Sequence, residues 1–171
     1  MNPIIERVKR AVTLSPGVYQ EIGNDPQGTT QAIIVAAAAA LIGGLGDLFG
    51  GRFGTWIFAA VIGPVVVAVF SAIVFVVSRM FNAQGTYIQL FRTLGFAYAP
   101  QALNVIPVIG AFVGFIWMVI LSIRAVKETQ QVSDGAAVAI VLIPAAIIVV
   151  LVVIVVVVIG IGLLGFAAAN S

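Results

Sequence analysis

Residues 145–159 read AAIIVVLVVIVVVVI and contain only alanine, valine, leucine and isoleucine. They lie within an apolar segment that covers about residues 136–166 and that, as a helix, is longer than the roughly 30 Å hydrocarbon core of a bilayer. So many β-branched residues would favour a strand in water, but the run is far too long for a strand. A helix in lipid satisfies all of its own backbone hydrogen bonds. The stretch therefore predicts a membrane-spanning helix that tilts, kinks at Pro144 or extends beyond the bilayer.

The composition of the whole chain agrees with this placement. Of its 171 residues 62% are hydrophobic and 8% are charged, whereas an average soluble domain is about 45–50% apolar and about 25% charged. The absence of cysteine and histidine excludes disulfides, thiolate nucleophiles, imidazole acid–base chemistry and Cys/His metal sites. The composition therefore predicts an integral membrane protein with few reactive groups.

Four further membrane segments precede the last one, and together the five make up a predicted membrane domain over residues 28–171. Polar side chains and Pro100 interrupt the third segment, so that it either crosses the bilayer or lies in the interface. The predicted spans cover about residues 28–46, 56–78, 87–106, 107–123 and 136–166.

Residues 1–27 are predicted to form a cytoplasmic tail that contains an amphipathic helix. Within residues 1–14 apolar residues such as Ile4, Val8 and Val12 recur at helical spacing, and charged residues take the other face. Such a helix lies either on an anionic leaflet or against the membrane domain of the same protein. The sequence leaves these two placements open.

The distribution of lysine and arginine decides whether the third segment crosses. If it does, Arg52 lies alone on one side, and the other seven cationic residues lie on or near the opposite side. If it lies flat, the two sides carry five and three cationic residues. The positive-inside rule favours the first arrangement. We therefore expect an all-α integral membrane protein of the cell (inner or plasma) membrane, a five-helix transmembrane bundle with a short amphipathic N-terminal helix. The N-terminus would be cytoplasmic and Ser171 would lie on the opposite side.

Few residues could carry chemistry. A serine nucleophile needs a base, and the spans contain neither histidine nor lysine, so we expect no catalytic residue, no metal site and no cofactor. Ionisable residues within spans are functional candidates, although Arg92 is more readily explained as an anchor whose side chain reaches back to the interface. The predicted polar face, which would contact lipid or a partner or begin a transport path, consists of Gln89, Arg92, Gln101 and Asn104.

Residues 90–100 read LFRTLGFAYAP, followed by IPVIG at residues 106–110 and by Ile116-Trp117. This run resembles the Yip family, membrane proteins of the eukaryotic secretory pathway that interact with Rab GTPases and that also have many bacterial relatives. The opening from Ser15 to Pro26 and the polar turn within residues 126–137 are similar as well, so the resemblance covers about residues 15–160. The positions that carry the motif are Gly95, Tyr98, Pro100, Pro107, Gly110 and Trp117.

The resemblance implies five membrane helices and a cytoplasmic N-terminus. Eukaryotic relatives take part in vesicle traffic with small GTPases, but the tail of this chain lacks a long acidic or aromatic recognition segment, which favours a bacterial member. We therefore expect a non-enzymatic protein that packs with other membrane proteins or with itself, or that shapes the bilayer, in one version as an accessory subunit of a larger membrane complex. The alternative is a small transporter or channel that uses the polar residues of the third span. Lipid is an expected partner, and nucleic acid is not.

Overall fold

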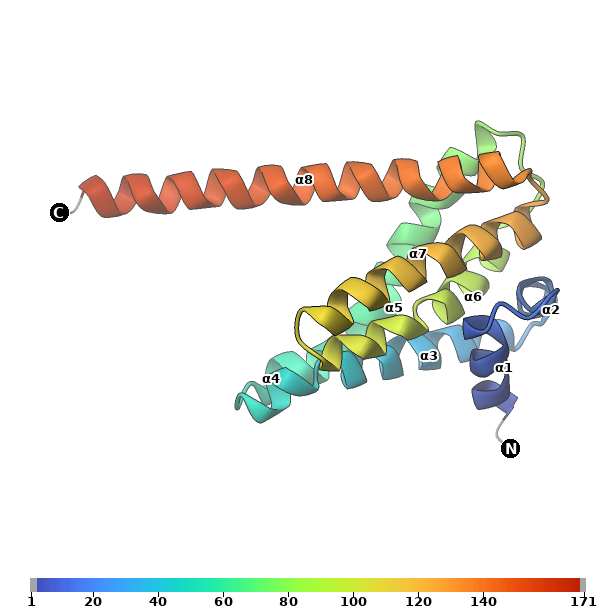
Figure 1. Ribbon diagram of the computed structural model, residues 1–171, viewed down its shortest axis with the longest axis horizontal. Coiled ribbons are helices and arrows are strands. Elements are labelled where there is room, and N and C mark those ends of the chain that lie inside the picture. The colour runs from blue at the N-terminus through green and yellow to red at the C-terminus, as the bar shows by residue number, and fades with distance from the viewer. Residues whose placement is uncertain (1–2, 170–171) are drawn as a thin grey trace.

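The computed structural model describes residues 3–169, and side chains throughout this range except at residues 151–152 and 161–169. All elements within the described range are helices (Figure 1). In chain order they are α1 (Pro3–Val12), α2 (Val18–Asn24), α3 (Gly28–Gly43), α4 (Leu45–Phe49), α5 (Phe53–Arg79), α6 (Tyr87–Ala97), the 3₁₀ helix η1 (Ala99–Val105), α7 (Ile109–Gln130) and α8 (Asp134–Ala169).

Three helices of the described chain are long and apolar enough to cross a membrane. They are α5 with 27 residues, α7 with 22 residues and the part Asp134–Gly160 of α8, also with 27 residues. Most side chains in the apolar part of each helix remain uncovered by the rest of the chain, as expected for helices whose solvent is lipid. The prediction of a helical, membrane-embedded protein is thereby confirmed.

The first and third predicted spans differ from the expectation of five long helices. The first is the 16-residue helix α3, about 24 Å long. The third is divided into the 11-residue α6 and the 7-residue η1, and the division falls beside Pro100, which has no N–H to continue the α-helix. The two parts together still extend over about 30 Å.

Successive helical segments run in alternating directions. The α3 and α6–η1 segments lie side by side and parallel, since Gly28 is next to Arg92 and Gly43 is next to Gln101. Helix α5 runs in the opposite direction and packs against both, with Gly63 against the backbone of Ala36. Helix α7 runs back along η1 and α6, and α8 reverses direction once more (Figure 1).

This arrangement gives the bundle two unlike ends. We call one of them the charged end: it consists of α1, α2, the turn between α2 and α3, the first half of α6, the starts of α3 and α8, and the ends of α5 and α7. Every charged residue of the sequence except Asp47 and Arg52 belongs to these segments. Asp47 and Arg52 form an ion pair beside α4 at the other end, which we call the far end.

Helix α1 packs on the bundle itself. Ala11 is fully buried, and Ile4, Val8 and Val12 pack against the core. The indole N–H of Trp117 donates to the carbonyl of Val12 over 3.1 Å. Of the two placements that the sequence leaves open, the structure therefore has the helix against its own membrane domain.

Helix α8 separates from the other helices. Its first turns pack against α5 and α7, with Ile140 and Val141 fully buried, and the rest extends away from the bundle (Figure 1). From Ile147 to Ile159 every described side chain is exposed, so the other helices of the described chain leave this part of α8 largely uncovered.

Candidate functional site

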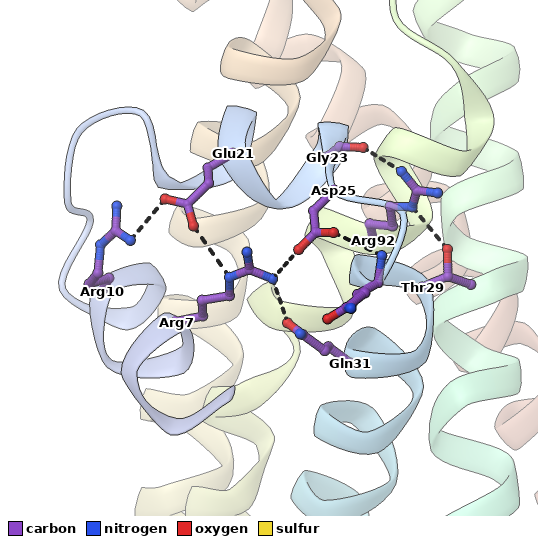
Figure 2. Close-up of polar contacts among 9 residues, drawn as sticks. Arg7, Arg10, Glu21, Gly23, Asp25, Thr29, Gln31 and Arg92 are labelled. Carbon is purple, nitrogen blue, oxygen red and sulfur yellow. Dashed lines mark hydrogen bonds and ion pairs between the residues drawn. The ribbon is translucent and has the colours of Figure 1, made fainter. Parts of the chain in front are cut away.

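Arg92 connects three elements at the charged end. Its Nη1 donates to the carbonyl of Gly23 and its Nε donates to Oγ1 of Thr29, both over 2.9 Å (Figure 2). The stem of the side chain packs on Gly28, where an added Cβ would lie 3.2 Å from Cδ of Arg92. The guanidinium therefore joins α6 to the end of α2 and the first turn of α3, and the interfacial anchor expected from the sequence is a contact inside the protein.

Arg7 is the centre of a second polar cluster, which attaches α1 to the same place. Its guanidinium donates to Asp25 over 2.5 Å, to Gln31 over 2.8 Å and to Glu21 over 3.3 Å. Arg10 pairs with the other oxygen of Glu21 over 2.8 Å (Figure 2). The side chain of Arg7 is only 18% exposed, so these contacts are partly shielded from solvent and stronger than those of an exposed pair.

Asp25 is the residue at which the two clusters meet. The backbone N–H of Gln27 and the guanidinium of Arg7 both donate to its carboxylate, and the charge of Arg92 lies nearby. These interactions favour the ionised form and hold the pKa of Asp25 below its ordinary value. The carboxylate is thus kept charged between two arginines.

Helix α2 is also attached to α7. The backbone N–H of Tyr19 donates to Oε2 of Glu128 over 3.2 Å, and Arg124 pairs with the other oxygen of Glu128 over 2.7 Å. The Tyr19 hydroxyl donates to the carbonyl of Ala11. Burial, together with the charge of Glu128, raises the pKa of Tyr19. The phenol therefore stays neutral and acts as a structural donor.

The four residues of the predicted polar face fall into two groups. Gln89 completes a capping box with Thr86 and donates to Oδ1 of Asn24, so it lies with Arg92 at the charged end. Towards the far end, Asn104 donates to Gln101 over 2.9 Å. Both of these residues line a cavity of about 240 Å³ between α3, α5 and η1. Buried residues from Leu94 to Ala97 separate the two groups along the chain.

The predicted motif residues lie mainly at close helix contacts. A Cβ added to Gly95 would lie 2.5 Å from Cβ of Ala32, and Gly110 lies directly against the carbonyl of Leu103. Pro100 is buried where η1 begins, whereas Pro107 is exposed. Tyr98 lies between α5 and α7, and Trp117 bonds to α1. The motif therefore describes packing around α6 and η1.

Sequence reasoning missed the role of Arg7 and Asp25. It placed Arg7 only among the charged residues of an amphipathic helix and gave Asp25 no role, and no local pattern links residues 18 apart. Within the described part of the chain, no three His, Cys, Asp or Glu side chains are grouped so that they could hold a metal ion. What the charged end can do chemically is hold α1, α2, α3, α6 and α7 together.

Comparison with known proteins shows which family the chain is similar to. A family model described as the Yip1 domain matches residues 10–168. No match is found among curated proteins or among solved structures.

Proposed function

Because the chain belongs to the Yip1 family, we propose that it is a non-catalytic, multi-pass membrane protein that acts by packing laterally against other membrane proteins, as an accessory subunit of a membrane complex. The observation that carries this proposal is the long, uncovered and wholly apolar surface of α8, next to a bundle whose charged residues are largely occupied in contacts with one another.

The directions of the helices support five crossings of the membrane. The α3, α5, α6–η1, α7 and α8 segments run alternately between the charged end and the far end, and α6–η1 is about 30 Å long, enough to cross the hydrocarbon core. Seven of the eight lysine and arginine residues belong to the charged end. The positive-inside rule then places the charged end and the N-terminus in the cytoplasm, and the end of α8 on the opposite side of the cell membrane.

The side chains of α8 suit contact with another helix. Valine and isoleucine have one strongly preferred rotamer in a helix, so packing them against a partner costs little side-chain entropy. Helix association in lipid depends on such close van der Waals contact, because lipid supplies no hydrophobic force between helices. We therefore assign the exposed part of α8 beyond Val149, residues 150–159, to a helix of a partner membrane protein.

Photo-crosslinking from within the membrane tests this assignment. A photoreactive amino acid replaces Val156, whose exposed fraction is 63%, and in a control it replaces Ile140, which is fully buried and does not line a cavity. Irradiation of intact cells should attach the first variant to a discrete membrane protein, whereas the control should give crosslinks within the chain. If position 156 forms adducts with lipid alone, the proposed function is wrong.

A further inference from the structure

A cavity of about 350 Å³ opens where α8 begins to leave the bundle. Its walls come from the three long apolar helices: α5 between Val65 and Phe70, α7 between Phe115 and Ser122, and α8 between Val141 and Val149. Its floor is formed by Leu94 and Tyr98 of the third segment. We call this cavity the α8 cleft, and its volume lies within the range of about 300–1,000 Å³ that is common for ligand sites.

The chemistry of the α8 cleft is that of hydrocarbon. Its lining residues other than Tyr98 and Ser122 have apolar side chains. The hydroxyl of Ser122 is occupied within its own helix, where it donates to the carbonyl of Met118 over 2.7 Å. A charged or strongly hydrogen-bonding ligand would lose its hydration in this cleft without compensation, so the lining selects an apolar occupant.

The length of the cleft distinguishes between two possible occupants, a lipid chain and a helix of a partner protein. The lining of α8 extends over about 12 Å, and those of α5 and α7 over about 8–11 Å. A spanning helix of a partner would need a groove along most of the roughly 30 Å core. A single lipid chain occupies one leaflet, which is about 15 Å of that core, and this length matches the cleft.

The depth of the cleft places it in one leaflet. Along α8 the lining begins about 10 Å after Asp134, and along α7 it ends about 12 Å before Gln130. Both helix ends belong to the charged end. The cleft therefore lies in the half of the hydrocarbon core next to the charged end, where lipid chains are the abundant apolar molecules.

From this geometry we infer that the α8 cleft is a binding site for one acyl chain of a bilayer lipid from the leaflet next to the charged end. This inference rests on the membrane placement proposed above, but not on a protein partner of α8. The acyl chain fills the space between α5, α7 and α8, where α8 diverges from the other two helices. An empty space of this size would forfeit the contacts of its lining atoms.

Two neighbouring alanines of α8 allow a matched test. Ala145 lines the cleft and is half-buried, whereas Ala146 is exposed and does not line it. Each is replaced by phenylalanine, and native mass spectrometry measures the fraction of chains that retain lipid after purification in mild detergent and addition of dioleoyl phosphatidylethanolamine. The unchanged chain and Ala146→Phe should carry one lipid per chain, and Ala145→Phe should lower the lipid-bound fraction about tenfold.

A second pair of substitutions, on α5, distinguishes loss of the lipid site from misfolding of Ala145→Phe. Val69 lines the cleft and Val76 does not, and both side chains are exposed. Val69→Phe should lower lipid retention while Val76→Phe leaves it unchanged. Equal retention by all four variants would overturn the inference. So would a bound second protein chain that the cleft variants displace. A retained lipid together with lipid-only crosslinks at position 156 would refute the proposed function but leave this inference intact.

Discussion

The guanidinium of Arg7 lies 2.5 Å from the carboxylate of Asp25, although 18 residues separate them in the chain. This contact connects α1 to the turn between α2 and α3, where Arg92 also binds (Figure 2). An amphipathic helix whose cation is engaged in this way is not free to lie on a leaflet. We therefore treat α1 as part of the folded bundle, and the first predictions concern this connection.

Arg7→Ala should detach α1. The substitution leaves two carboxylates and an amide without their common donor, so we expect the free energy of unfolding in detergent to fall by about 2 kcal/mol and proteolysis before residue 18 to become faster. Lys9→Ala is the matched control, because Lys9 is exposed. Equal protease resistance in both variants would show that apolar packing alone holds α1.

Acid should weaken the same connection through Asp25. Its pKa in the folded protein is lowered from the ordinary value of 3.8, so folding favours the ionised form. The stabilisation is fully present above the unfolded pKa and is lost as the pH falls through the folded pKa. Thermal unfolding measured between pH 6 and about pH 3 should therefore show a loss of stability below about pH 4 that is smaller in Asp25→Asn. An identical slope in both proteins would assign the acid effect to another group.

Substitution of Arg92 separates a structural role from transport. Arg92→Ala removes the hydrogen bonds to Gly23 and Thr29, so we expect a loss of about 2 kcal/mol in stability. Arg92→Lys should recover only part of it, because an ammonium cannot reproduce the fork of the guanidinium. Fluxes of ions and small solutes into reconstituted vesicles should be equal for all three proteins. A flux that falls in Arg92→Ala while stability is unchanged would favour the transporter alternative.

Gly95→Ala should disturb the contact between α3 and α6. The added Cβ would lie 2.5 Å from Cβ of Ala32, and we expect such overpacking to cost about 1–3 kcal/mol. Gly54→Ala is the control, since a Cβ at Gly54 meets no atom within 4 Å. Adding Ala32→Gly to Gly95→Ala should restore part of the stability. Failure of this rescue would mean that the two helices do not approach each other at these residues.

Single cysteines can test the five crossings, because the chain has no cysteine of its own. Asp47→Cys, at the far end, should react with a membrane-impermeant maleimide added to intact cells. Lys127→Cys, at the charged end, should react only after the membrane is opened. Reaction of both variants from the same side would indicate that α6–η1 does not cross and would support four spans.

The apolar runs made most of the helices predictable. Helices α5, α7 and α8 follow directly from them, since no other structure satisfies so long an apolar backbone in lipid. Pro100 predicted the division of the third segment. The 3₁₀ conformation that follows could not be predicted, because it depends on the close contact of η1 with α3 and α7. The short α3 reflects the small residues around Gly43 and Gly44, where the chain turns.

The candidate site was less predictable than the fold. Composition identified Gln89, Arg92, Gln101 and Asn104 as the polar residues of the third segment. Three of them bond to residues far away in the sequence: Gln89 to Asn24, Arg92 to Gly23 and Thr29, and Gln101 to Met118. The same holds for Arg7 and Asp25. A partner that is chosen by the packing of helices leaves no periodic signal in the chain, so only the structure shows it.

The length of α8 makes the protein responsive to its host membrane. Its 36 residues extend over about 54 Å, and a helix of this length fits a 30 Å core by inclining, by thickening the surrounding lipid or by extending beyond the bilayer. A thinner bilayer would make α8 incline further, and a thicker one would bring it upright. Because its first turns are packed on α5 and α7, the inclination of α8 also sets the width of the α8 cleft. A change in membrane thickness would therefore change the width of this cleft.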